Sequence, residues 1–463
     1  MSDESVRKLV DEAVKLRYSR RQVLKRASAL GLAAPAIGVA LAASGHSASA
    51  ATRRAPAVLQ GTSLNILAAT YFVPDAQTFY EEQVRTWGEE NNVDVTVDFI
   101  NWPDLQPRIS SAVQAGSGPD IIEMWDTWPY LYYEQMVPMG DLAQRVGDKH
   151  GGFYEWVINT ASVDGEWYSV PHGNSTTAMP FRISYVEEAG ISDPVKNFPQ
   201  TWEEFFALAK ELKAMGKPVG QALGQSLGDP PGFAYPFMWS YGAMEVEDDG
   251  KTVAFNKPEF VDAMEMFIQA WEDGYDETGL SWDDSVNNSA YLSDQISATL
   301  NGSSIYIAAK KSEADGGNPA IAEDTHHANI PGGPAGQFNA LGSRSYGAMN
   351  YSENVEGATA FLEWWFDDAR YVPWLEAYQG YIVPPGPAHS ELGVFTEDPK
   401  LAAYANVVNL ARNKGFAGPA NEKAAQVSSN YVIVNTFANA IQSGDASGSI
   451  EQGAQELERF YNR

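Results

Sequence analysis

The region between residues 63 and 125 alternates strand-like and helix-like patterns, and this order constrains the fold more than any other feature of the chain. A short apolar strand is expected over 63–69, and apolar residues at helical spacing follow it. Residues 93–99 then alternate apolar with acidic or polar side chains, as in a strand with one face in water. A helix over 104–115 and a strand over 121–125 come next. This β-α-β order predicts an α/β fold with parallel strands.

Two capping boxes predict helices further along the chain. Thr201 with Glu204 precedes one apolar stripe, and Asn256 with Glu259 precedes another. Both stripes are typical of helices that face a core. The other elements that we expect are strands over 305–308 and 346–349 and helices over 288–300 and 356–368.

Length and charge limit the architecture and the partners. A chain of 463 residues exceeds what one core usually spans, so two lobes are expected. It carries 60 Asp and Glu against 31 Lys and Arg, a net charge of −29. Such a chain repels nucleic acids and anionic membrane surfaces. It has no cysteine, which excludes disulfides, thiolate metal sites and a lipid-modified cysteine.

The first fifty residues resemble a twin-arginine export signal. Arg20 and Arg21 precede an uncharged apolar run over 27–43, and the small-x-small sequence Ala-Ser-Ala at 48–50 follows it. We expect cleavage after Ala50, a disordered lead over 51–61, and a mature protein that works in the periplasm or at the cell surface. An uncleaved membrane anchor is the alternative, although 17 residues are few for a membrane span.

Motifs for common enzyme chemistries are missing from the sequence. There is no Gly-x-Ser-x-Gly elbow, no Walker loop and no Gly-x-Gly-x-x-Gly fingerprint. His150, His172 and His389 leave a metal site open, against the simpler interpretation that they are solvated or capping residues. Carboxylates are abundant, so counting them does not exclude a glycosidase pair.

Aromatic clusters beside polar residues are the most informative site candidates. Trp125, Asp126 and Trp128 follow the 121–125 strand, and ligands of open α/β sheets bind outside the carboxyl ends of strands. A second cluster extends over 233–239, for which packing is an equally good explanation, and Tyr71-Phe72 and Tyr381 are further candidates for which packing is the slightly better one. Flat aromatic rings suit the C–H side of a sugar ring, and an Asp or an amide accepts hydrogen bonds from its hydroxyls.

Five segments in order resemble one protein family. They are AGSGPDII at 115–122, MVPMGDL at 136–142, GEWYSVP at 165–171, AGI at 189–191 with FPQTWEEF at 198–205, and ATLNG at 298–302. This order is similar to that of the family 1 extracellular solute-binding proteins, the maltose-binding-protein-like receptors of ABC importers. Two positions depart from the family: Phe181-Arg182 stands where relatives usually have Tyr-Asn, and Ser303-Ser304 stands where many have Gly-x-Trp.

The resemblance implies an α/β, two-lobed periplasmic-binding-protein type II fold, with a ligand cleft between the lobes and two to three hinge crossovers. The first lobe would take residues 62–171 and 327–373. The second lobe would take 172–326 and 374–463, whose C-terminal helices would pack across both lobes.

The resemblance also implies a function and a site. The chain would be the substrate-binding component of an ABC importer, a monomer without cofactor, metal or catalytic residue that passes a sugar or oligosaccharide to a membrane permease. An exported glycoside-active enzyme and a receptor for a polyamine or metal are the alternatives. Together with the aromatic clusters, it gives these ligand-binding candidates: Tyr71, Phe72, Trp125, Asp126, Trp128, Asn174, Ser175, Phe233, Tyr235, Trp239, Gly302, Ser303, Arg344, Tyr381 and Asn430.

Overall fold

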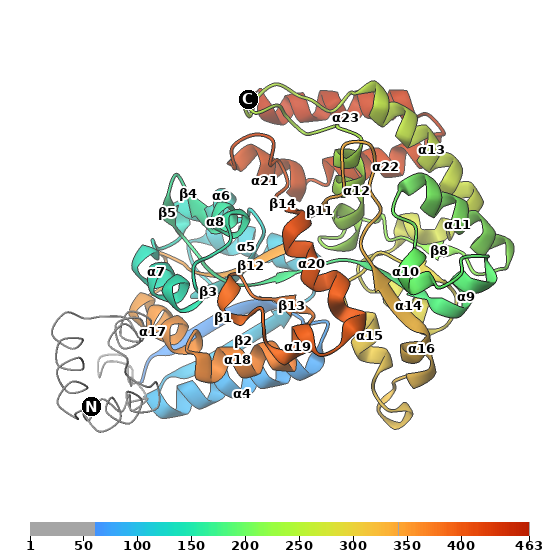
Figure 1. Cartoon of the computed structure of the whole chain (residues 1–463). Coiled ribbons are helices and arrows are strands. Elements are labelled where there is room, and N and C mark those ends of the chain that lie inside the picture. The colour runs from blue at the N-terminus through green and yellow to red at the C-terminus, as the bar shows by residue number, and fades with distance from the viewer. Residues whose placement is uncertain (1–60, 341, 463) are drawn as a thin grey trace, which may run out of the picture. The chain divides into compact units, whose positions relative to one another are not determined.

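A computed structural model describes residues 61–340 and 342–462 of the protein (Figure 1). The export signal expected over 1–50 and nearly all of the lead expected over 51–61 lie outside the described residues. The predicted α/β class is confirmed, because the chain forms two sheets of four or more strands, with helices packed on them.

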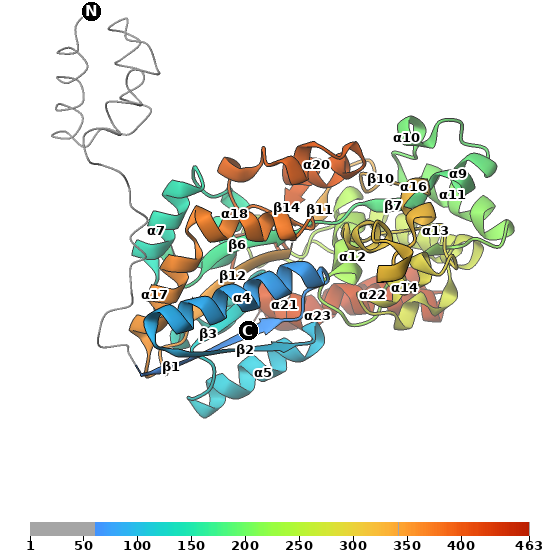
Figure 2. The same cartoon turned by 90° about the horizontal axis from the view of Figure 1, so that it is seen from below.

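The first sheet has six strands in the order β13-β6-β12-β3-β1-β2. Strands β1, β2 and β3 are parallel, whereas β12 runs antiparallel to both β3 and β6. Helix α4 covers one face of the parallel strands and α5 the other (Figure 2). The strands are β1 (Ser63–Ala69), β2 (Asp94–Ile100), β3 (Ile121–Trp125), β6 (Val170–Ser175), β12 (Gly342–Ala348) and β13 (Ile382–Val383), and the principal helices are α4 (Pro74–Asn91), α5 (Trp102–Ala115), α7 (Gly140–Lys149), α17 (Val355–Trp365) and α18 (Asp368–Ala377).

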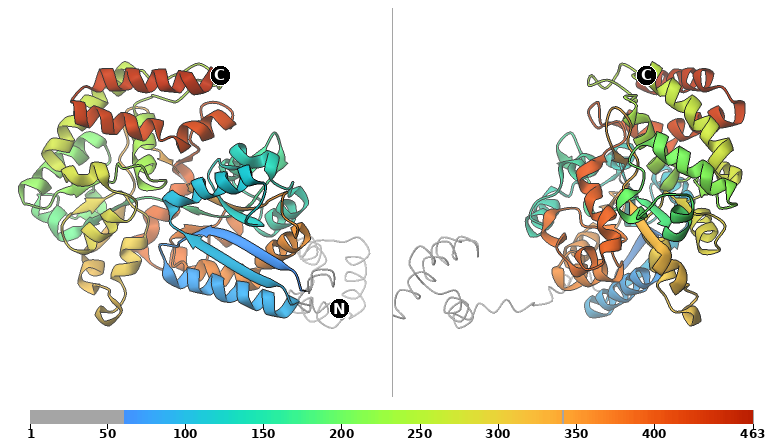
Figure 3. Two further views of the ribbon diagram at one scale, coloured as in Figure 1. Left: turned by 180° about the vertical axis from the view of Figure 1, so that it is seen from behind. Right: turned by 45° about the vertical axis from the view of Figure 1, so that its right-hand side comes forward.

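The second sheet has four strands in the order β10-β7-β9-β8. Its helices form a separate body from those of the first sheet, as the view from behind shows (Figure 3). The strands are β7 (Met179–Arg182), β8 (Val219–Gly220), β9 (Ala298–Thr299) and β10 (Thr325–Ala328), and the helices are α11 (Trp202–Ala214), α12 (Asp229–Ser240), α13 (Pro258–Gly274), α14 (Val286–Leu292), α15 (Ser304–Ala309), α22 (Val432–Ser443) and α23 (Ala446–Tyr461).

The chain passes between the two sheets three times. It leaves the first sheet after β6, returns between β10 and β12, and after β13 runs on to α22 and α23. A two-stranded parallel pair, β11 (Asn339–Ala340) with β14 (Ala411–Arg412), lies in the connecting segments. The lobe limits stay predictions, but β13, in the range assigned to the second lobe, pairs with β6 in the first sheet.

Each lobe has its own aromatic core. In the first, Trp87, Trp365 and Trp374 are fully buried against the sheet. In the second, Trp202 and Phe267 belong to a cluster that joins α11, α12, α13 and α22. Burying so many large apolar side chains separately on each side makes two stable bodies joined by few strands.

The structure confirms two local signals in the sequence and contradicts a third. The strand over 63–69 is confirmed, and so is the capping box, in which the Thr201 hydroxyl accepts from the Glu204 amide at 3.3 Å. The box at Asn256 is wrong: Lys257 caps α13 because Pro258 occupies the first helical position.

Two further expectations for the second lobe are wrong. The expected strand over 305–308 is the helix α15, because a short buried apolar run does not distinguish strand from helix. The expected helix over 288–300 ends at Leu292, and strand β9 follows.

Candidate functional site

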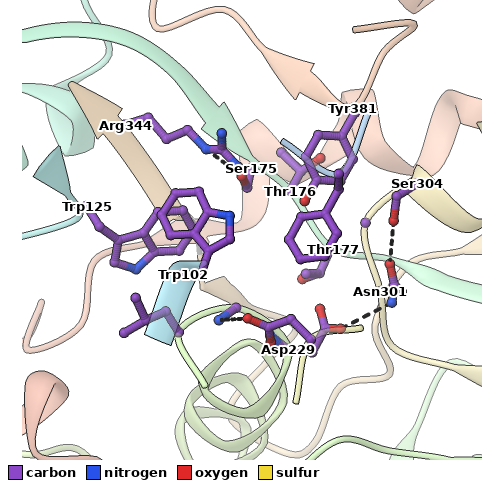
Figure 4. Close-up of a pocket in the computed structure, with 15 residues that line it drawn as sticks. Trp102, Trp125, Ser175, Thr176, Thr177, Asp229, Asn301, Ser304, Arg344 and Tyr381 are labelled. Carbon is purple, nitrogen blue, oxygen red and sulfur yellow. Dashed lines mark hydrogen bonds between the residues drawn. The ribbon is translucent and has the colours of Figure 1, made fainter. Parts of the chain in front are cut away.

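A pocket lies between the two lobes, at the point where the chain leaves β6 (Figure 4). We call it the central pocket; its empty volume is about 430 Å³, part of it open to solvent. Residues of both lobes and of the crossing segment line it. They are Phe72, Trp102, Trp125, Ser175, Thr176, Thr177, Leu227, Gly228, Asp229, Asp284, Asn301, Gly302, Ser304, Arg344 and Tyr381.

An aromatic wall comes from the three parallel strands of the first sheet. Phe72 follows β1, Trp102 follows β2, and Trp125 ends β3, so the carboxyl ends of these strands deliver all three rings to one place. The rings of Trp102 and Trp125 meet edge to face at 4.8 Å between centroids. The Trp102 indole is fixed by donating to the carbonyl of Thr70 at 3.1 Å.

Arg344 of β12 completes this wall and is 1% exposed. Its Nε donates to Ser175 Oγ at 3.1 Å, and its guanidinium carbon lies 4.6 Å from the Trp102 ring centroid. The side chain is thus held by a hydrogen bond to Ser175 and a cation–π contact with Trp102.

A buried carboxylate compensates the charge of Arg344 from beneath. Glu123 Oε1 lies 3.7 Å from Arg344 Nη1 and 3.2 Å from His172 Nε2, and the amide of Ala69 donates to Oε2 at 3.0 Å. Burial acts to raise the pKa of Glu123, but His172, Arg344 and this amide lower it below its usual value. Burial lowers the pKa of His172. The pair beneath the wall is therefore carboxylate and guanidinium, beside a neutral imidazole.

The opposite wall, from the second lobe, presents two carboxylates. Asp229 Oδ2 accepts from the amides of Asn287 at 2.7 Å and Asn301 at 3.1 Å. Asp284 accepts from the backbone amides of Gly228 at 3.0 Å and Asp229 at 2.8 Å, and so caps the start of α12.

Both carboxyl groups of this wall have displaced pKa values. Burial raises the pKa of Asp229 well above its usual value, and the charge of Asp284 raises it further. Burial also raises the pKa of Asp284, although the hydrogen bonds it accepts act in the opposite direction.

The two lobes touch at Tyr381 and Gly302. A Cβ atom on Gly302 would lie 2.6 Å from the Tyr381 ring, so only glycine lets the second lobe approach this closely. Beside them, Thr176 in the crossing segment is 1% exposed, and its hydroxyl has no hydrogen-bond partner among the described residues.

A second cavity, which we call the adjoining pocket, continues from the central pocket and shares Phe72, Trp102 and Asp284 with it. Its empty volume is about 820 Å³. Its other lining residues are Thr70, Tyr71, Asn101, Pro103, Asp104, Ser226, Asp283 and Ser285.

Of the site residues predicted from sequence, the structure brings six to the central pocket. They are Phe72, Trp125, Ser175, Gly302, Arg344 and Tyr381. Tyr71 lines the adjoining pocket instead, with its hydroxyl 3.2 Å from that of Tyr346. Whether these residues contact a ligand stays a prediction.

Four predicted residues do not line the central pocket. Asp126 pairs with Lys414 at 2.5 Å, both side chains 3% exposed, and Trp128 packs in the first lobe. The Asn174 amide points to the carbonyl of Pro384 at 3.4 Å, and Ser303 is buried at the start of α15.

The remaining predicted residues lie elsewhere. Phe233, Tyr235 and Trp239 are in the core of the second lobe, because every residue of α12 is buried. Asn430 lies on a separate groove beside α22, where its amide donates to the carbonyl of Gln426 at 2.8 Å.

Sequence reasoning missed several lining residues: Trp102, Thr176, Thr177, Leu227, Gly228, Asp229, Asp284, Asn301 and Ser304. Trp102 carried a usable signal, since it follows the 93–99 strand just as Trp125 ends the next one. Asp229 and Asp284 carried none, because nothing local separates them from the other acidic residues of this chain.

The histidines do not form the metal site that the sequence left open. The rings of His150 and His389 lie 5.0 Å apart, while His172 contacts Glu123. Within residues 61–340 and 342–462, no group of three or more His, Asp or Glu is arranged to hold a metal ion.

None of the helices in that same part of the chain has the length and apolar character needed to cross a membrane.

Two lobes with a lined pocket at their junction define the class of two-lobed binding proteins. The family model described as bacterial extracellular solute-binding protein matches residues 82–403. The chain therefore belongs to the bacterial extracellular solute-binding proteins, which confirms the resemblance seen in the sequence.

Individual relatives are distant in sequence but close in fold. A protein of Brucella abortus that is named a putative binding protein is 25% identical over 371 residues, which cover 76% of this chain and 83% of that protein. An ABC transporter solute-binding protein of Thermotoga lettingae, solved with α-D-tagatose, matches with a TM-score of 0.75 and 18% identity, over 87% of this chain and 100% of that one. A maltose-bound protein of T. maritima matches with a TM-score of 0.72 and 16% identity, over 86% and 100%.

Proposed function

We propose that the chain is the substrate-binding component of an ABC importer, which binds a sugar or oligosaccharide between its lobes and delivers it to a membrane permease. The observation that carries this proposal is the composition of the central pocket: Trp102, Trp125 and Phe72 on one side, and Asp229 with Asn301 on the other.

This composition suits a carbohydrate. The C–H face of a sugar ring packs on flat aromatic side chains, and its hydroxyls donate to carboxylates and accept from amides and guanidinium groups. The related proteins solved with tagatose and with maltose agree with this choice of solute.

Binding would act through the lobes. A solute that contacts Trp102 in the first lobe and Asp229 in the second gains both sets of contacts only when the lobes are closed. It therefore shifts the population toward the closed form by that difference in affinity. The permease would recognise the closed form.

Export and assembly are further parts of the proposal. The twin-arginine signal over 1–50 supports export of a folded chain, with cleavage after Ala50 and a site of action in the periplasm or at the cell surface. We propose a monomer that is not lipid-anchored through cysteine, since the chain contains none.

The proposed receptor needs no catalytic group, which separates it from a glycoside-active enzyme. Such an enzyme would need two carboxylates on opposite sides of a glycosidic bond. Asp229 and Asp284 instead lie together at the start of α12, where one accepts from the other's backbone amide.

A thermal-shift screen tests the proposal. The full chain is refolded to remove carried solute and screened against mono- and oligosaccharides, with analysis of each sugar afterwards. We expect a saccharide that raises Tm and is recovered intact. Recovery of a cleaved saccharide would support an enzyme instead, and no shift with any saccharide would refute the sugar assignment.

A further inference from the structure

The two pockets are lined by more acidic than basic side chains. Asp229 and Asp284 line the central pocket, and Asp104 and Asp283 line the adjoining one. Arg344 is the one Lys or Arg among the described residues that line either pocket. A solute in this cleft therefore meets carboxyl groups on the second-lobe side and, at Asp104, in the first turn of α5.

The charge of Arg344 does not balance these carboxylates. Glu123, which is fully buried and does not line the pocket, lies 3.7 Å from Arg344 Nη1. Its negative charge offsets the guanidinium before any solute arrives. An anionic sugar would thus meet no uncompensated cation among the described residues that line the two pockets.

Three of these four aspartates accept hydrogen bonds from neutral groups. Asp229 accepts from two side-chain amides, Asp284 from two backbone amides, and Asp283 from the amide of Ser285 at 2.8 Å. No described Lys, Arg or His forms an ion pair with any of them. By contrast, Asp294 of the same lobe is paired with both Arg182 and Lys217.

Independent of this charge, the central pocket contains polar atoms that lack a partner. Thr176 is 1% exposed, and its hydroxyl has no hydrogen-bond partner among the described residues. The same holds for Nε1 of Trp125, which is 6% exposed. Trp125 belongs to the aromatic wall and Thr176 to the crossing segment, and both line the pocket (Figure 4). Because these two residues line the pocket, a polar ligand there would supply the hydrogen bonds that their side chains lack.

We propose that the solute is a carbohydrate that carries a basic amine, with its ammonium group held at Asp229 and Asp284 and its ring against Trp102. This inference rests on the proposed function and narrows its substrate class. An ammonium group has three donors, which suit two carboxylates and a hydroxyl such as that of Thr176. The ring supplies the apolar face that Trp102 and Phe72 require.

A retention experiment with the full chain tests this proposal. The probe is a mixture of neutral, N-acetylated, aminated and acidic saccharides of one to four rings, with spermidine added, and the retained compounds are identified by mass spectrometry. Affinities are then measured for matched sets such as D-glucosamine, D-glucose and N-acetyl-D-glucosamine. We expect an aminated saccharide to be retained and to bind about tenfold more tightly than its neutral and N-acetylated counterparts.

The variant Asp229→Asn tests the position of the amine. The asparagine oxygen still accepts from Asn287 and Asn301, but the carboxylate is gone. We therefore expect the affinity for the aminated saccharide to fall to about the affinity for the neutral one. Asp262→Asn, an exposed residue of α13, removes the same charge far from the pocket and should leave the preference intact. If Asp229→Asn does not fold, the unchanged protein supplies a second test, because the preference should weaken as salt concentration rises.

Each outcome separates this inference from the proposed function. Equal or tighter binding of the neutral or N-acetylated saccharide, or retention of an acidic one, overturns the inference and leaves the sugar receptor standing. Retention of spermidine with no saccharide overturns both. Retention of nothing from the mixture also overturns both.

Discussion

The two walls of the central pocket carry opposite charges that are handled in opposite ways. In the first lobe, Arg344 lies over Glu123, so a charge is matched by a charge inside the protein. In the second lobe, Asp229 and Asp284 are held by amides, and no cationic side chain of the described residues pairs with them before a solute enters the pocket. The charged group of the first wall thus has its partner within the folded protein, whereas the carboxyl groups of the second wall leave room for a partner on the ligand.

Removing the buried partner should break the first wall most severely. Glu123→Gln leaves the Arg344 guanidinium buried and without its counter-charge, so we expect a loss of about 3–5 kcal/mol of unfolding free energy. Chemical denaturation at neutral pH measures it. The control is Glu89→Gln, which removes an exposed pair with Arg85 and should cost less than about 1 kcal/mol. Equal losses in the two variants would show that Glu123 is not the counter-charge of Arg344.

Separating the two walls should be the next largest effect. Gly302→Ala places a Cβ atom 2.6 Å from the Tyr381 ring, so we expect a loss of about 1–3 kcal/mol in stability, together with weaker saccharide binding. Denaturation and titration calorimetry check the two parts. Gly232→Ala is the matched control, because its Cβ would meet its nearest neighbour at 3.4 Å. An alanine at 302 with unchanged affinity would mean that the contact between the lobes does not shape the pocket.

The two walls should also respond to pH with opposite signs. Burial lowers the pKa of His172, so the unfolded chain takes up a proton first and stability falls as pH drops below about 6.5. Burial raises the pKa of Asp229, so the folded chain keeps its proton longer and stability falls as pH rises above about 4.

Unfolding free energies of Asp229→Asn and of the unchanged chain between pH 4 and pH 8 test this difference, an interval chosen from the usual pKa values of roughly 4 and 6.5. We expect the variant to gain stability relative to the unchanged chain as pH rises. A constant difference across the interval would mean that Asp229 has an ordinary pKa.

The smallest expected effect concerns the aromatic wall. Trp102→Phe keeps a ring against Trp125 but loses the hydrogen bond to Thr70, so stability should fall by about 0.5–1.5 kcal/mol. Thermal unfolding measures it. A larger loss would show that the packing of the indole also contributes to stability.

The sequence predicted the parallel strands and the aromatic residues at their ends because both are local patterns. Trp125 and Phe72 could be placed near the site from strand ends alone, and Trp102 obeys the same rule. The cluster over 233–239 misled the prediction, because its aromatic residues are on a helix that is buried on all sides. Local sequence does not reveal which neighbours will surround a helix.

The second wall could not be predicted, since it depends on distant segments. Asp229 meets Asn287 and Asn301, which are 58 and 72 residues further along the chain. Likewise, Glu123 and Arg344 meet because β3 and β12, which are far apart in the sequence, are neighbours in the folded sheet. Such partners are fixed by topology, and no spacing in the sequence indicates them.

A crystal structure of the full chain with the saccharide that gives the largest thermal shift would test the central claim most directly. The account predicts the saccharide between the lobes, with a ring on Trp102 and polar contacts to Asp229 and Asn301. A saccharide bound outside the two pockets, or contacting one lobe alone, would contradict it.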